Sequence, residues 1–153
     1  GSADGQHWLI AGERGLVLRS DDQGQRWQTV APFYNGSFYN AIAQKDGGWL
    51  VYGMRGNVFR SARQGEPWSR SEVPAPISFF GHGVGADGRV ILVGQGSMIA
   101  TSTDGGSHFK LSRAAGRATL TDLQLQADGS ALITSDAGLQ TLPATSRPAG
   151  TTP

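Results

Sequence analysis

Residues 46–61 (DGGWLVYGMRGNVFRS) and residues 87–102 (DGRVILVGQGSMIATS) are two copies of one pattern, placed 41 residues apart. Each copy contains an Asp-Gly pair, an apolar run, a turn with glycine and a second run that ends on serine. The pattern starts again at Asp128-Gly129, a further 41 residues along, and at Asp4-Gly5, 42 residues before the first copy. Self-similarity at a fixed period is the signature of a repeat architecture, so the repeat decides the fold class before local propensity does.

Each unit of the repeat predicts four short β-strands, called A to D in chain order. Strand A precedes the Asp-Gly pair at 38–43, 79–84 and 120–125, and strand B follows it at 7–11, 48–52, 89–93 and 130–134. Glycine turns, which supply positive φ, come next at 12–15, 53–56, 94–97 and 135–138. Strand C then ends at Ser20, Ser61 and Ser102, and an aromatic residue closes the unit at Trp27, Trp68 and Phe109. A four-stranded antiparallel repeat of about 40 residues is typical of a β-propeller blade.

We therefore expect an all-β fold of about three and a half propeller blades. The units lie near 3–30, 37–71, 78–112 and 119–142. The first unit lacks strand A and the last stops after strand C, while residues 143–153 are too proline-rich and polar for a strand and predict a flexible tail. The expectation is the C-terminal part of a seven-bladed propeller. The alternative is that copies associate through their open blade edges as a homo-oligomer.

Composition excludes several classes of function. The formal net charge is +1, with 13 Lys and Arg against 12 Asp and Glu spread along the chain, so no basic stripe is available for nucleic acid. The absence of cysteine excludes disulfides, thiolate catalysis and Cys-ligated metals. No apolar stretch approaches the roughly 18 residues that a membrane span needs. Gly1-Ser2 resembles the remnant of a protease site, so any export signal is expected to have been removed already.

The strongest local motif is S-x-D-x-G-x-x-aromatic, found at 20–27 (SDDQGQRW) and at 102–109 (STDGGSHF). In such a turn the aspartate accepts bonds from the N–H groups that follow it, the glycine takes a positive φ, and the aromatic ring packs under the turn. We interpret the motif as a folding device and not as a catalytic one. The residues assigned to it are Ser20, Asp22, Gly24, Trp27, Ser102, Asp104, Gly106 and Phe109. The middle copy, at 61–68, has Arg63 in place of the aspartate.

This motif resembles the Asp-box, or BNR repeat, of sialidases and several other propellers. With the preceding turn and strand included, residues 12–27 look like the repeat of the photosystem II stability/assembly-factor propeller family, and the resemblance extends over residues 4–142. It implies a seven-bladed, exported assembly factor without known catalytic activity or cofactor, in a lumen or periplasm. Relatives in bacteria without photosynthesis mean that the match does not imply photosynthesis. The expected partner is a protein, either a membrane protein or its exposed segment.

The order of strands predicts which loops share a face. In an up-and-down blade the B–C turns and the D–A loops lie on one side, and the Asp-boxes lie on the other. This places Glu13, Arg14, Met54 and Arg55 beside Phe33, Tyr34, Asn35 and Phe79, and we expect a partner to bind there. Arg14 and Arg55, at equivalent positions of adjacent units, are suited to a carboxylate. The alternatives are solvated turn arginines or a local pair with Glu13, and aromatic rings that fill the core or the channel.

Enzymatic function is not expected. His7, His82 and His108 come from different parts of the repeat, so a three-histidine zinc site would be an accident of geometry. A glycosidase needs two opposed carboxylates, and no pair stands out among the acids that are not assigned to turns. A sialidase would need an arginine triad and a tyrosine nucleophile. A glycan-binding or glycan-hydrolysing propeller remains the alternative, because catalytic groups can lie in a part of the ring outside this chain.

Overall fold

The computed structural model describes residues 1–62 and 67–143. The predicted tail after residue 143 and the substituted motif position Arg63 lie outside the described residues. The chain forms four antiparallel sheets, one for each repeat. Blade 1 consists of β1 (Trp8–Ala11), β2 (Val17–Ser20) and β3 (Gln28–Thr29). Blade 2 consists of β4 (Phe38–Ala43), β5 (Trp49–Gly53), β6 (Val58–Ser61) and β7 (Trp68–Arg70).

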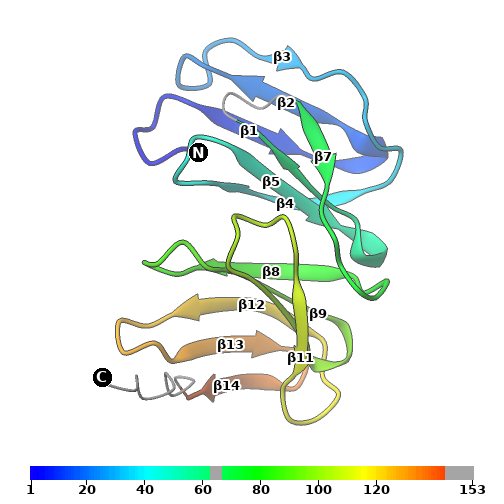
Figure 1. Cartoon of the computed structure of the whole chain (residues 1–153), viewed down its shortest axis with the longest axis vertical. Helices are drawn as coiled ribbons and strands as arrows, with labels where there is room; N and C mark the ends of the chain where they lie inside the picture. Colours follow the sequence, from blue (N-terminus) through cyan, green and yellow to red (C-terminus); the bar gives the residue numbers. More distant parts are fainter. Residues whose placement is uncertain (63–66, 144–153) are drawn as a thin grey trace, which may run out of the picture.

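The other two sheets follow the same plan. Blade 3 consists of β8 (Phe79–Val84), β9 (Val90–Gly94), β10 (Met98–Ser102) and β11 (Lys110–Arg113). Blade 4 consists of β12 (Leu120–Leu125), β13 (Ala131–Ser135) and β14 (Gly138–Leu142). Among residues 1–62 and 67–143, the first and last sheets have three strands and the middle two have four, and blade 1 has no strand A, as predicted. Figure 1 shows the blades following one another along the long axis, from blue to red.

The hydrophobic core is divided among the three interfaces between blades. Val17, Val51 and Phe59 are buried between blades 1 and 2, and Leu50, Tyr52 and Leu92 between blades 2 and 3. Val93, Leu120 and Ile133 are buried between blades 3 and 4. Each interface therefore uses the period-2 alternation of two neighbouring sheets, as expected for a repeat that cannot bury its faces alone.

The B–C turns of blades 1 to 3 are short 3-10 turns: η1 (Glu13–Gly15), η2 (Met54–Gly56) and η4 (Gln95–Ser97). Their third residues donate backbone hydrogen bonds to the D–A loops, from Gly15 to Gly36 at 2.6 Å and from Gly56 to Ile77 at 2.6 Å. Gly15 has φ 71°, and a Cβ added there would lie 1.8 Å from the carbonyl oxygen of Tyr34. Glycine at this position is therefore needed both for the turn and for the close approach of the loop.

Candidate functional site

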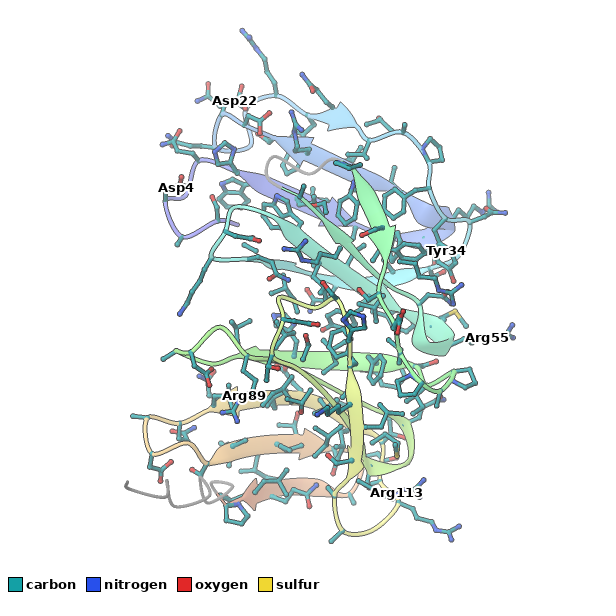
Figure 2. The ribbon with its side chains drawn as sticks, in the orientation of Figure 1. Asp4, Asp22, Tyr34, Arg55, Arg89 and Arg113 are labelled. Atoms are coloured by element: carbon teal, nitrogen blue, oxygen red, sulfur yellow. The ribbon has the colours of Figure 1, made fainter. Side chains whose placement is uncertain are left out.

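The B–C turns and the D–A loops lie at one edge of the sheets, which we call the B–C face. The A–B turns and the Asp-box turns lie at the opposite edge, the Asp-box face. Figure 2 shows Tyr34, Arg55 and Arg113 at the first edge, and Asp4 and Asp22 at the other. The face predicted to bind a partner is thus a continuous side of the molecule, built from three consecutive blades.

Arg14 and Arg55 are exposed on the B–C face and share one backbone conformation. Arg14 has φ 54° and ψ 33°, and Arg55 has φ 55° and ψ 39°, whereas the equivalent residue of blade 3 is Gly96 with φ 65°. The left-handed region is costly for any residue with a Cβ. Arginine therefore occupies in two blades a conformation that glycine adopts in the third.

Two further arginines of this face, Arg113 and Arg117, were not found by the sequence reasoning. They lie at the end of β11 and in the loop after it, and both are exposed. Sequence reasoning missed them because it compared only the turn position that carries arginine in blades 1 and 2. Blade 3 has Gly96 at that position, and its arginines on this face lie in a different segment. Within residues 1–62 and 67–143, neither of them, nor Arg14 or Arg55, forms an ion pair with a carboxylate.

On the Asp-box face, by contrast, arginines do meet carboxylates. Arg60 lies 2.7 Å from Asp46, and Arg19 lies 2.8 Å from Asp21. Arg26, which is exposed on the same face, has no ion pair among the described residues, so unpaired arginines occur on both faces and four of them lie on the B–C face. Glu13, next to Arg14, forms no ion pair in the described part of the chain, and Asn35 is exposed beside these groups.

The aromatic residues predicted for this face serve mainly in packing. Phe33 stacks on Trp68 with ring centroids 4.6 Å apart, and Tyr34 lies 5.1 Å from Phe59, so both rings are half-buried between blades 1 and 2. The prediction for Phe79 is wrong. Phe79 is the first residue of β8, and its side chain is 0% exposed in the core between blades 2 and 3, so it is not available to a partner.

The first Asp-box turn is held by its own side chains. The Ser20 hydroxyl donates to Asp22 Oδ1 at 2.8 Å and accepts the backbone N–H of Gly24 at 2.8 Å. Asp22 Oδ1 also accepts the N–H of Arg26 at 2.8 Å, and Gly24 has φ 84°. The hydrogen bond from the Arg26 N–H, followed by that from Ser20, lowers the pKa of Asp22. The carboxylate is thus used in the turn, with Trp27 donating to the carbonyl of Gly24 at 2.9 Å.

The third Asp-box adds a histidine. Asp104 Oδ1 accepts bonds from the Ser102 hydroxyl at 2.7 Å and the His108 N–H at 3.0 Å, and its other oxygen lies 2.6 Å from His108 Nδ1. Although burial opposes the shift, these hydrogen bonds hold the pKa of Asp104 well below its usual range. The bond to Asp104 in turn raises the pKa of His108. The turn is closed by Gly106, with φ 84°, and by Phe109, which is buried in the core.

Between blades 2 and 3, the Tyr52 hydroxyl lies 2.9 Å from His82 Nδ1. Burial lowers the pKa of His82 and raises that of Tyr52, so both side chains are neutral near pH 7. The pair joins neighbouring blades and is a structural contact. Among the described residues, no group of three or more His, Asp or Glu side chains has the arrangement of a metal site.

Hollows on the Asp-box face were not expected from the sequence. One of about 440 Å³ lies between blades 1 and 2 and is bordered by Asp4, His7, Asp21 and Lys45. Another of about 330 Å³ lies between blades 2 and 3, beside Asp104. The carboxylates around them accept hydrogen bonds from turns or pair with arginine and histidine, which leaves no opposed pair of free acids.

Comparison with known proteins identifies the fold. The structure is similar to that of YCF48 bound to a D1 peptide, with a TM-score of 0.67 and 20% sequence identity over 89% of this chain and 45% of that chain. It is similar to an ancestral GH74 enzyme, with a TM-score of 0.73, 12% identity, and 92% and 22% of the two chains covered. It is also similar to the extracellular domain of a hybrid two component system from B. thetaiotaomicron, with a TM-score of 0.74, 15% identity, and 96% and 21% covered.

Similarities at these identities show the β-propeller fold and nothing finer. The chain spans less than half the length of each of these three structures. No protein-family model matches the chain, and no curated protein sequence matches it. The part of the chain that the structure describes has no helix with the length and apolarity needed to span a bilayer.

Proposed function

We propose that this chain is a non-enzymatic protein-binding module whose B–C face receives carboxylate groups of a partner through Arg14, Arg55, Arg113 and Arg117. The observation that carries the proposal is the set of four exposed arginines without a carboxylate partner, two of them in a backbone conformation that favours glycine. Guanidinium groups bind carboxylates with two parallel hydrogen bonds. Conformational strain retained at exposed arginines is typical of a binding surface.

We further propose that the module assists the assembly or stability of a membrane-associated complex outside the cytoplasm, in the periplasm of a bacterium. The support is the resemblance of residues 12–27 to the photosystem II stability/assembly-factor repeat, together with the structural likeness to a propeller solved with a bound peptide. The likeness to a GH74 enzyme shows that the fold also carries glycoside hydrolases. The turn-bound and paired carboxylates of this chain favour binding over hydrolysis.

Binding of an acidic peptide tests the proposal. The probe is an immobilised peptide of alternating glutamate and glycine, with a glutamine version as the uncharged control. We expect salt-sensitive binding to the glutamate peptide that falls at least tenfold in an Arg14→Ala/Arg55→Ala variant. Arg26→Ala, an exposed arginine on the Asp-box face, is the matched control and should bind as the unaltered protein does. Equal binding by the double variant and the control would overturn the proposal.

A further inference from the structure

A separate cavity of about 260 Å³ lies between blades 3 and 4. Its lining comes from both sheets: aliphatic side chains, chiefly Ile91, Val93, Ile99, Leu123, Ile133 and Leu142, lie beside the polar side chains of Arg89, Thr101 and Ser112. The aliphatic part of this lining offers few hydrogen bonds to water.

The cavity arises from two departures of blade 4 from the repeat. Ala131 occupies the position that holds Trp49 in blade 2 and Val90 in blade 3, so the sheet presents less side-chain volume there. Strand β14 also pairs one residue out of step. In blade 3 Val90 pairs with Ser102, but in blade 4 Ala131 pairs with Leu142, one residue earlier in the repeat. The space is therefore built into the sequence of the last blade.

Arg89 borders the cavity at its Asp-box end. Its Nε is buried without a hydrogen-bond partner, while the side chain as a whole is 31% exposed and forms a long ion pair, with Nε 3.9 Å from Asp87 Oδ2. A buried N–H without an acceptor is costly, and a charged one more so. In Figure 2 Arg89 lies against the body of the molecule, whereas Arg55 and Arg113 extend from the opposite edge. Thr101 and Ser112 are the other polar side chains of the lining.

The cavity adjoins a second hollow, which lies on the Asp-box face. A hollow of about 430 Å³ between the A–B turns of blades 3 and 4 shares three lining residues with the cavity, Arg89, Leu125 and Gly129. Arg89 therefore stands where the open hollow meets the apolar space. A ligand entering from this side would bring its polar end to rest at the guanidinium group.

We propose that this cavity binds a medium-chain aliphatic carboxylate, with the carboxylate at Arg89 and the hydrocarbon chain among Ile91, Ile99 and Ile133. An apolar cavity of about 150 Å³ accommodates benzene, so 260 Å³ is suited to a ligand of roughly ten non-hydrogen atoms. Apolar walls with one charged group at the mouth are the usual design of small-molecule sites. The site lies away from the B–C face and does not depend on the function proposed for that face.

Octanoate is the probe, measured by isothermal titration calorimetry and by NMR shifts of the isoleucine methyl groups. We expect saturable binding at one site, with shifts confined to Ile91, Ile99 and Ile133. Octan-1-ol, which lacks the charge, should bind at least tenfold more weakly. Arg89→Gln should weaken octanoate binding by about 10- to 100-fold, as expected for loss of a charged hydrogen bond. The control, Arg26→Gln, should leave it unchanged.

Filling the cavity gives an independent test. Ala131→Val introduces the residue that blade 3 uses at this position and should weaken octanoate binding, while the larger Ala131→Leu should abolish it. Circular dichroism establishes that both variants are folded, and the milder variant keeps the test valid if the larger one is not. The proposal would be overturned if the protein did not bind octanoate at 5 mM (on the order of 3 kcal/mol of affinity). It would also be overturned if Arg89→Gln and Ala131→Val bound octanoate as tightly as the unaltered protein does. Equal affinity for octan-1-ol would overturn it as well.

Discussion

Replacing Arg14 and Arg55 with glycine is expected to stabilise the protein while it removes binding to acidic partners. Both residues have positive φ, at 54° and 55°. The left-handed conformation costs a residue with a Cβ about 1–2 kcal/mol, and the greater freedom of glycine in the unfolded chain takes back about 0.5–1 kcal/mol. The free energy of unfolding should therefore rise by about 0.5–1 kcal/mol per site. The sites lie in different blades and should contribute additively.

Urea unfolding followed by circular dichroism measures the change, and differential scanning calorimetry should show a Tm higher by roughly 2–8 °C for the double variant. The reverse substitution, Gly96→Arg, should lower stability by a similar amount, because Gly96 has φ 65°. A fall in stability for both Arg14→Gly and Arg55→Gly would refute the reasoning, since it would mean that the guanidinium groups stabilise the fold. Binding to the acidic glutamate peptide should fall in the same variants.

Three further predictions concern the turns and the core. Asp104→Ala removes the acceptor for Ser102, Ser107 and His108 and should lower the free energy of unfolding by about 1–2 kcal/mol. Urea unfolding measures this change. An unchanged midpoint of the urea transition would contradict a structural role for the Asp-box. Asp104, and then Glu72, raise the pKa of His108, so protonated His108 stabilises the fold below about pH 6.5. This stabilisation is lost as the pH rises through the pKa of His108 in the folded protein. The difference in unfolding free energy between the unaltered protein and His108→Gln should therefore shrink from pH 5.5 to pH 8.5, and a constant difference would exclude the coupling. Phe79→Ala should destabilise by about 3–5 kcal/mol, since the ring is fully buried, and a loss below about 1 kcal/mol would return Phe79 to the surface role predicted from the sequence.

The repeat made most of the fold predictable. Strands β4, β8 and β12 have the bounds expected from the runs before each Asp-Gly pair, and the three-stranded sheets at both ends follow from the missing runs. Periodicity works here because each unit has the same strand order, so a motif found in one blade locates the equivalent residues of the next. The same logic placed Arg14 and Arg55 on one face.

Features that break the repeat were not predictable. Each strand A has a register shift after its first residue, between Phe38 and Asn40 in β4 and at equivalent positions in β8 and β12. The three blades share no residue type at this position that would have predicted the shift. Phe79 lies at the boundary between loop and strand, and a shift of one residue there decides between exposure and burial. The cavity between blades 3 and 4 depends on the altered pairing of β14, which emerges only when the strands are assembled.

The most direct test of the central claim is an NMR titration of the arginine Nε–H signals with the acidic glutamate peptide. The account predicts that the signals of Arg14, Arg55, Arg113 and Arg117 shift together and saturate, while those of Arg19 and Arg60 on the Asp-box face stay in place. Shifts confined to the Asp-box face, or no shift at any arginine of the B–C face, would contradict it.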